Sequence, residues 1–399
     1  MPFSWRRNCS ARPMSGRYLV AITACPAKPA WLCYRYQVTL AIWNEMVRRA
    51  KAKAKVEGPP AVENSRAPTM ADVAQRAGVS AMTVSRALKD GGVVSKDTRE
   101  RILQATEELG YVLDQSAGSL SSKRTGFIAA IVPSINNSNF SDTARGIADA
   151  LDGTGLQLLL GYTDYSMQRE ESLVESMLRR RPEGIILTGG HHTPRTRKLL
   201  LAAGIPVIET WDVPAKPIDQ VVGFSNEGAM STLVLKLAEK GYKRFGYVGG
   251  TTDRDTRGSQ RRVGFQRALR QLGLPDNRLI SFGVPPISIE QGGQAVVSML
   301  ETWPDTEVVI CVSDLSAFGA LMECRRRGLE VPGDIAIAGF GNFEVGEWSH
   351  PRITTVDVEC YEIGRRAALR IRASILGGAD APDSAIELTR IRVVERESA

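Results

Sequence analysis

The chain has few of the residue types on which catalysis and metal binding usually depend. Only three histidines occur among its 399 residues. Two of them, His191 and His192, are adjacent, so they cannot both be metal ligands on one face of a helix or strand. The sequence also lacks G-x-S-x-G and Walker motifs, and no G-x-G-x-x-G follows an expected strand. We therefore expect no enzymatic activity, no catalytic residues, no bound metal and no cofactor.

Long apolar runs and cysteine pairs are scarce as well. No stretch approaches the roughly 18–20 apolar residues that a transmembrane helix needs. The six cysteines form no C-x-x-C pair, a pattern typical of reduced thiols in the cytosol rather than of a disulfide scaffold. These absences favour a cytoplasmic protein without a membrane anchor, and its 43% hydrophobic residues can support a large core.

The excess of positive charge is confined to the N-terminal end. Residues 1–66 hold 12 Lys and Arg against 3 Asp and Glu, a net charge of +9, whereas the rest of the chain has a net charge of −2. We interpret residues 1–66 as a basic extension that is disordered or non-native, with Met46 as the preferred start. An export signal is the alternative, because the short apolar run 18–24 leads into Cys25 as in a lipoprotein cleavage box.

The run from Thr69 to Leu88 predicts two short helices at a sharp angle, joined by a turn at Gly78. Thr69 can cap the first helix, with Asp72 at its third position as in a capping box, and Ser80 can cap the second. Glycine suits this turn because it adopts a positive φ without strain. Such a helix-turn-helix reads the major groove of DNA, although an ordinary helical hairpin on a protein surface fits the same pattern.

A third helix is expected from Lys96 to Leu109, with Ser95 as its N-cap and Gly110 as its C-terminal stop. Three helices of this size are about the smallest unit that can bury a core. The apolar residues expected to face the first two helices are Ile102, Leu103, Ala105 and Leu109.

From Phe127 onward, apolar runs alternate with helical patterns. The expected strands are 127–132, 156–160, 184–187, 206–208, 245–248, 279–282, 308–312 and 335–338. Examples of the expected helices are 142–153, 167–180, 227–240, 259–272 and 316–327. This alternation predicts an α/β domain of parallel sheets with right-handed crossovers, split over two lobes. Ligands bind at the carboxyl ends of such strands, which here means the cleft between the lobes.

The N-terminal motifs resemble those of the lactose-repressor (LacI) family of bacterial regulators. The motifs are A-D-V-A-x-x-A-G-V-S-x-x-T-V-S-R, then V-S-x-x-T-R-x-R-I, then L-G-Y and a linker that contains a leucine. The resemblance implies an all-α headpiece at 67–113, a hinge helix or linker at 114–125, and an effector domain at 126–399. It further implies that the effector domain is a two-lobed α/β domain of the periplasmic-binding-protein-like type I, whose lobes are crossed near 224, near 357 and at the C-terminal end.

By this resemblance, the headpieces of a homodimer, or of a dimer of dimers, would read double-stranded operator DNA. Ala81 and Met82 would meet thymine methyl groups and Arg86 would pair with guanine, while Thr83 and Ser85 hold phosphates. Leu120 would insert as a wedge between base steps in the minor groove. The residues expected to contribute to DNA binding are Thr69, Ser80, Ala81, Met82, Thr83, Ser85, Arg86, Ser95 and Leu120.

The expected effector contacts lie at the ends of strands and the beginnings of helices. The segments 192–196, 204–209 and 222–226 are similar to those of gluconate-responsive repressors, and an arginine can grip the carboxylate of a sugar acid with two hydrogen bonds. Gly341 and Asn342 follow the Gly-aromatic pair, where family members that bind neutral sugars or bases often carry an aspartate, and its absence favours an anionic effector. The expected effector-binding residues are Asn139, Phe140, Arg195, Trp211, Arg261, Ser313, Asp314 and Asn342.

Plainer interpretations exist for two of these residues. Arg195 also fits a surface position at the start of a helix, and Asp314 also fits a helix cap. For the whole chain, we predict a cytoplasmic, nucleoid-associated repressor of a carbohydrate or sugar-acid operon that an effector such as gluconate releases from DNA. The alternative is an exported or lipid-anchored sugar-binding protein of a transport system, which would have no use for the headpiece.

Overall fold

The computed structural model describes residues 66–88, 94–113, 124–250, 254–376 and 384–399. The chain divides into two compact units after Leu113. The N-terminal extension and most of the predicted hinge, including Leu120, lie outside the described residues.

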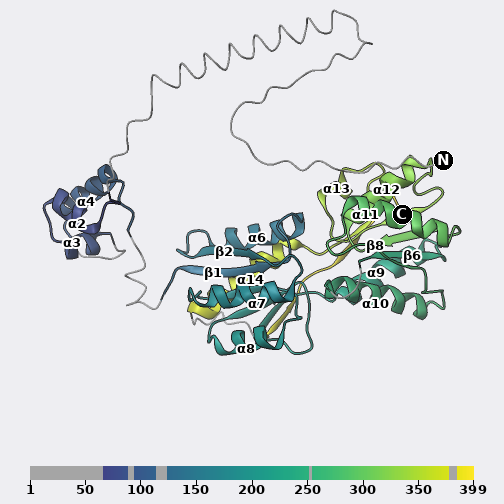
Figure 1. The fold of residues 1–399 in the computed structure, drawn as a ribbon, viewed down its shortest axis with the longest axis horizontal. Helices are drawn as coiled ribbons and strands as arrows, with labels where there is room; N and C mark the ends of the chain where they lie inside the picture. Colours follow the sequence, from purple (N-terminus) through teal and green to yellow (C-terminus); the bar gives the residue numbers. More distant parts are fainter. Residues whose placement is uncertain (1–65, 89–93, 114–123, 251–253, 377–383) are drawn as a thin grey trace, which may run out of the picture. The chain divides into compact units, whose positions relative to one another are not determined.

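The first unit contains the three predicted helices, α2 (Met70–Ala77), α3 (Ala81–Ala87) and α4 (Lys96–Leu109) (Figure 1). Gly78 ends α2 with a φ of 67°, and Gly110 ends α4 with a φ of 62°, as the turn and stop signals predict. The helix-turn-helix expected from the sequence is therefore present, with α4 as its third helix.

One apolar core holds the three helices together. Its central side chains, Val73, Val84 and Ile102, are fully buried. Arg76 of α2 adds an ion pair with Glu108 of α4 at 2.5 Å. The prediction for Leu103 was wrong, because its side chain is 50% exposed and lies outside this core.

The second unit begins with a lobe built on a six-stranded sheet of order β11-β5-β4-β3-β1-β2, in which all paired strands are parallel. Its strands are β1 (Phe127–Val132), β2 (Gln157–Tyr162), β3 (Ile185–Thr188), β4 (Val207–Thr210), β5 (Gln220–Gly223) and β11 (Ile386–Leu388). Its helices are α6 (Ser138–Leu151), α7 (Met167–Leu178), α8 (Pro194–Ala202) and α14 (Cys360–Leu376).

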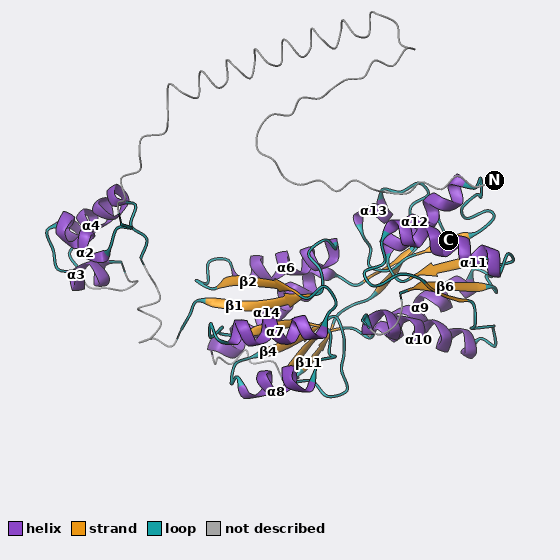
Figure 2. Ribbon diagram, viewed as in Figure 1, coloured by secondary structure: helices purple, strands orange, loops and turns teal. Residues whose placement is uncertain are grey.

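Alternate residues of each strand face opposite layers of helices, as the pleat requires. Ile128 and Ala130 of β1 pack with α6 and α14, whereas Ala129 and Ile131 pack with residues of α7 and α8 (Figure 2). Burial on both faces explains why these strands read as continuous apolar runs.

The other lobe has a parallel four-stranded sheet of order β7-β6-β8-β9. Its strands are β6 (Phe245–Gly249), β7 (Leu279–Ser281), β8 (Val308–Cys311) and β9 (Ala336–Ala338). Its helices are α9 (Asn226–Glu239), α10 (Thr256–Gln271), α11 (Ile289–Thr302), α12 (Asp314–Arg326) and the short α13 (Glu344–Glu347). Residues of α9 and α10 cover one face of the sheet, and residues of α11 and α12 cover the other.

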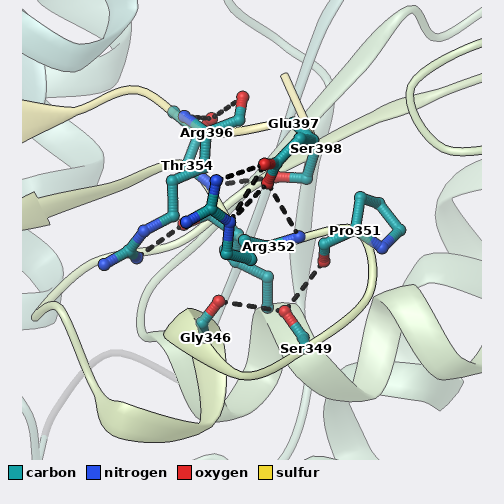
Figure 3. Close-up of polar contacts among 9 residues, drawn as sticks. Gly346, Ser349, Pro351, Arg352, Thr354, Arg396, Glu397 and Ser398 are labelled. Atoms are coloured by element: carbon teal, nitrogen blue, oxygen red, sulfur yellow. Dashed lines mark hydrogen bonds and ion pairs between the residues drawn. The ribbon is translucent and has the colours of Figure 1, made fainter.

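The chain passes between the lobes after β5, between β10 (Thr355–Asp357) and α14, and between β11 and β12 (Arg392–Val394). Strands β10 and β12 form a separate antiparallel pair. The last residues then return to the second lobe, where Ser398 accepts a hydrogen bond from Thr354 N and Arg352 forms an ion pair with Glu397 (Figure 3). The polypeptide chain therefore crosses between the two lobes three times.

Several short strands and some helix starts of this unit differ from the sequence prediction. The strands β5, β10, β11 and β12 were not predicted, because each is only three or four residues long. Helix α6 begins at Ser138 rather than at residue 142, since Asn137 caps it by accepting from Asn139 N. Asn139 and Phe140 therefore lie on the first turn of this helix rather than before its start.

Candidate functional site

The outer face of α3 presents a small group of side chains to solvent. Ala81 and Arg86 are exposed, and Met82 is 65% exposed. Thr83 and Ser85 are partly exposed beside them. A short helix with one arginine, one thioether and hydroxyl groups on its free face has the chemistry needed to read base edges and phosphates.

The predicted capping residues fix the beginnings of the three helices. Asp72 accepts hydrogen bonds from the backbone N and the hydroxyl of Thr69, which lower the pKa of its carboxyl group. Ser80 Oγ accepts from Thr83 N at 3.2 Å, and Ser95 Oγ accepts from Thr98 N at 3.4 Å. These contacts set where each helix starts and hence which residues of α3 face outward.

In the second unit, a cavity of about 50 Å³ lies where the two lobes meet. It is called the inner chamber below. Five predicted effector residues, Asn139, Phe140, Trp211, Arg261 and Ser313, line it. The other lining residues are Asn137, Tyr165, Asp255, Arg257, Pro285, Pro286, Ile287, Val312, Leu315, Phe340 and Phe343.

Aromatic rings form much of the chamber wall. The ring centroids of Phe140 and Trp211 are 5.0 Å apart, and Trp211 is held in place because its indole N–H donates to Thr143 Oγ1 at 3.1 Å. The Arg261 guanidinium lies 3.8 Å from the centroid of Phe340. Apolar rings combined with a few fixed polar groups are typical of a small-molecule site.

Hydrogen bonds between the lobes close the cleft around this chamber. Asn139 Nδ2 donates to Gly341 O at 3.0 Å, and Gln260 Nε2 donates to Asp212 Oδ2 at 3.1 Å. A Cβ at position 341 would crowd Asn139 and Phe343, and the residue has a φ of 117° that favours glycine. The close approach of the two lobes therefore depends on a glycine at this position.

Two arginines of α10 reach the chamber, and they differ in their surroundings. Arg261 already donates to Asn226 Oδ1 at 3.0 Å and to Val312 O at 2.9 Å. Arg257, which the sequence analysis missed, is 6% exposed and its Nη1 atom has no hydrogen-bond partner among the described residues. It was missed because α10 begins at Thr256, three residues before the predicted start.

The structure corrects the prediction for Arg195. This residue lies on α8 with its side chain 59% exposed, and it forms ion pairs with Glu171 and Glu175 of α7. It does not line the chamber. The plainer interpretation, a surface residue near the start of a helix, accounts for it.

Asp314 and Asn342 also lie outside the chamber wall. Asp314 is fully buried and accepts hydrogen bonds from Thr355 Oγ1 and from Phe343 N, and burial raises the pKa of its carboxyl group to about 6. Asn342 Oδ1 accepts from Arg396 Nη2 at 2.7 Å. Both side chains hold the segment after β9 in place, so their expected effector contacts are replaced by structural ones.

A buried cluster of three charged residues lies in the first lobe. His192 Nδ1 is 2.7 Å from Glu170 Oε1, and His192 Nε2 is 3.4 Å from Glu209 Oε1. Burial alone would lower the pKa of His192, but the hydrogen bond to Glu170 and the nearby carboxylate of Glu209 outweigh it and raise this pKa to about 9. The imidazole is therefore protonated at neutral pH and compensates the charge of both glutamates.

No helix within the described ranges is long and apolar enough to cross a membrane.

The chain matches two family models and several known proteins. Residues 69–114 match the bacterial regulatory proteins of the lacI family, and residues 234–399 match a periplasmic binding protein-like domain. The HTH-type transcriptional regulator GntR of Pseudomonas aeruginosa is 35% identical over 331 residues, which cover 83% of this chain and 95% of that protein. The HTH-type transcriptional regulator IdnR of Escherichia coli is 35% identical over 307 residues, which cover 77% of this chain and 92% of that protein.

Solved structures agree with these sequence matches. A LacI family transcriptional regulator from Silicibacter pomeroyi is 35% identical with a TM-score of 0.78, covering 83% of this chain and 99% of that one. The transcription regulator GntR from Chromobacterium violaceum is 30% identical with a TM-score of 0.64, covering 68% and 98%. Since relatives at this level of identity are matched over nearly their whole length, headpiece included, the chain belongs to the lacI family of bacterial regulatory proteins and is a DNA-binding transcriptional regulator.

Proposed function

We propose that this regulator represses a sugar-acid catabolic operon and leaves its operator when a sugar acid such as gluconate binds. The observation that carries the proposal is the arginine-containing inner chamber between the two lobes, in a chain that also carries a helix-turn-helix. The relatives called GntR and IdnR support the same class of regulator. We further propose that the protein works as a cytoplasmic homodimer without catalytic activity.

On DNA, the outer face of α3 would lie in the major groove. Ala81 and Met82 would contact thymine methyl groups, and Arg86 would donate hydrogen bonds to a guanine. Thr83 and Ser85 would donate hydrogen bonds to phosphates of the DNA backbone. At the N-termini of α2, α3 and α4, the capping residues Thr69, Ser80 and Ser95 would contact DNA phosphates. Leu120, outside the described residues, would be the minor-groove wedge.

Effector binding has to be coupled to these contacts. We place the effector in the inner chamber, against Asn139, Phe140, Trp211, Arg261 and Ser313. The contacts that close the cleft, such as Asn139 to Gly341, would shift when the chamber is filled. A useful switch needs a coupling free energy of about 1–3 kcal/mol between effector and operator.

Arg86→Ala should weaken operator binding by about 1–3 kcal/mol and relax the preference at one base pair, because one bidentate guanine contact is lost. The measurement is a titration of operator variants at fixed salt. Arg267→Ala is the matched control, since Arg267 is an exposed arginine on α10, in the other unit. Unchanged affinity in Arg86→Ala would remove α3 from the DNA interface.

The proposed function itself is tested with DNA from the chain's own promoter. The purified protein should retard this fragment in a gel, and gluconate or a related sugar acid should release it at concentrations where the neutral sugar has no effect. A fragment that is never retarded, or that no sugar acid releases, would refute the proposal. Light scattering of the same sample should give the mass of a dimer.

A further inference from the structure

A second cavity, here called the outer chamber, shares part of its wall with the inner chamber. Each has a volume of about 50 Å³, and Tyr165, Asp255 and Arg257 line both. The outer chamber lies beyond the carboxyl ends of β2 and β3, where Thr163 and Thr188 form part of its wall. The site is therefore elongated, and Arg257 lies at the point that the two chambers share.

Arg257 is a buried cation without a full set of partners. Its side chain is 7% exposed, and its Nη1 atom is buried without a hydrogen bond among the described residues. The carboxylate of Asp255 is 3.9 Å from Nε, beyond hydrogen-bonding distance. The rings of Phe140 and Tyr165 lie 5.2 Å and 5.9 Å from the guanidinium carbon and fix its position.

A buried guanidinium in this state is unfavourable unless an anion completes its hydrogen bonds. The planar fork of an arginine matches a carboxylate with two parallel bonds. Arg261 is less suited to this task, because two of its three nitrogens already donate to protein oxygens. Arg257 has only the distant carboxylate of Asp255 as an ion-pair partner, and its Nη1 atom lacks a hydrogen bond, so it marks where the negative charge of a ligand would be held.

The rest of the outer chamber suits a chain of hydroxyl groups. Thr163, Ser166, Thr188 and Thr256 supply hydroxyls that both donate and accept. Glu170 also lines this chamber, but its carboxylate is paired with the protonated His192 and so repels an anion less. Helices α7 and α10 begin beside the chamber and add positive potential there.

We propose that Arg257 is the residue that selects a negatively charged effector, and that the effector is a straight-chain polyhydroxy carboxylate long enough to occupy both chambers. The carboxylate binds the Arg257 guanidinium, and the hydroxyl-bearing chain follows the chamber walls. This inference rests on the proposed function and specifies the ligand of that same site.

Titration calorimetry with gluconate tests the role of Arg257. Arg257→Gln should lower the affinity by about 30-fold, the range expected when a hydrogen bond to a charged group is lost. Arg257→Lys should fall between wild type and Arg257→Gln, because it keeps the charge and loses the fork. Arg267→Gln, an exposed charge removal on the same helix, should bind like wild type. Thermal unfolding of each variant shows that it is folded.

A series of straight-chain acids with three, four and six carbons tests the elongated site. Affinity should rise by about tenfold or more along the series, since each added hydroxyl meets a polar wall. Thr188→Val removes a hydroxyl from the outer chamber without changing its shape, so it should weaken the six-carbon acid and leave the three-carbon acid unchanged. Glucose and glucose phosphate serve as the neutral and phosphorylated comparisons.

Four results would overturn the inference. They are equal gluconate affinity in Arg257→Gln and wild type, equal affinity for the short and the long acids, equal affinity for glucose, and stronger binding of glucose phosphate than of gluconate. In each of these cases a sugar acid could still release the operator, so the proposed function would stand. If no sugar acid binds at all, the proposed function fails together with the inference.

Discussion

The free energy of unfolding of the second unit should fall by about 3 kcal/mol between pH 6.5 and pH 9 through the loss of a single proton, that of His192. The folded protein holds this proton up to about pH 9, while the unfolded chain releases it near pH 6.5. The contribution is therefore complete below pH 6.5 and disappears as the pH rises through about 9. Urea unfolding followed by circular dichroism at a series of pH values measures it.

The variant His192→Gln should lose this pH dependence. At pH 7 it should also be less stable by about 3–5 kcal/mol, because Glu170 and the fully buried Glu209 would face each other without a cation. Among the described residues, the Glu209 carboxylate would keep its hydrogen bond from Ile218 N alone. His350→Gln, at an exposed position in a loop, is the control and should retain the wild-type profile. If the free energy of unfolding of His192→Gln depended on pH in the same way as that of the wild type, His192 would not be the source of this pH dependence.

Gly364→Ala should destabilise the second unit by about 3 kcal/mol and also weaken effector binding. A Cβ at position 364 of α14 would overlap the backbone carbonyl of Thr143 in α6. Since Thr143 Oγ1 accepts from the Trp211 indole, a shift of α6 would also displace the wall of the inner chamber. Urea unfolding and gluconate titration of the same sample measure both effects.

The control for this substitution is Gly228→Ala in the first turn of α9. A Cβ at that position approaches only the Ser225 side chain, at 3.3 Å from its hydroxyl oxygen. Its stability should change by less than about 1 kcal/mol, within the range of helix propensity. A loss as large as that of Gly364→Ala would show that the close contact between α6 and α14 is not the cause.

Local signals were sufficient to predict the headpiece. Capping residues and two glycines define α2, α3 and α4, and each signal acts within a few residues of the helix end that it sets. Leu103 shows the limit of such patterns, because periodicity alone does not say how wide the buried stripe of a helix is. The parallel sheets were predicted for a similar reason, since strands buried on both faces are continuous apolar runs.

The effector site was predicted less completely, because its residues are brought together by the fold. Arg257 lies in the first turn of α10 and Tyr165 in the turn before α7, so the direction of each side chain depends on where the helix begins. The partners of His192 lie on α7 and β4, so no spacing in the sequence links them. Asp314 follows a strand end as predicted, but its carboxylate faces Thr355 rather than the chamber.

The headpiece and the hinge together have little net charge, and this affects how salt should influence operator binding. Residues 67–126 hold 8 Lys and Arg against 7 Asp and Glu. Two of these arginines already pair with acids, Arg76 with Glu108 and Arg101 with Asp97. Association of this surface with DNA would release few condensed counterions, so the affinity should fall only gently as ionic strength rises. Discrimination between operator and bulk DNA would then rest on the shape and chemistry of α3 across a wide range of salt.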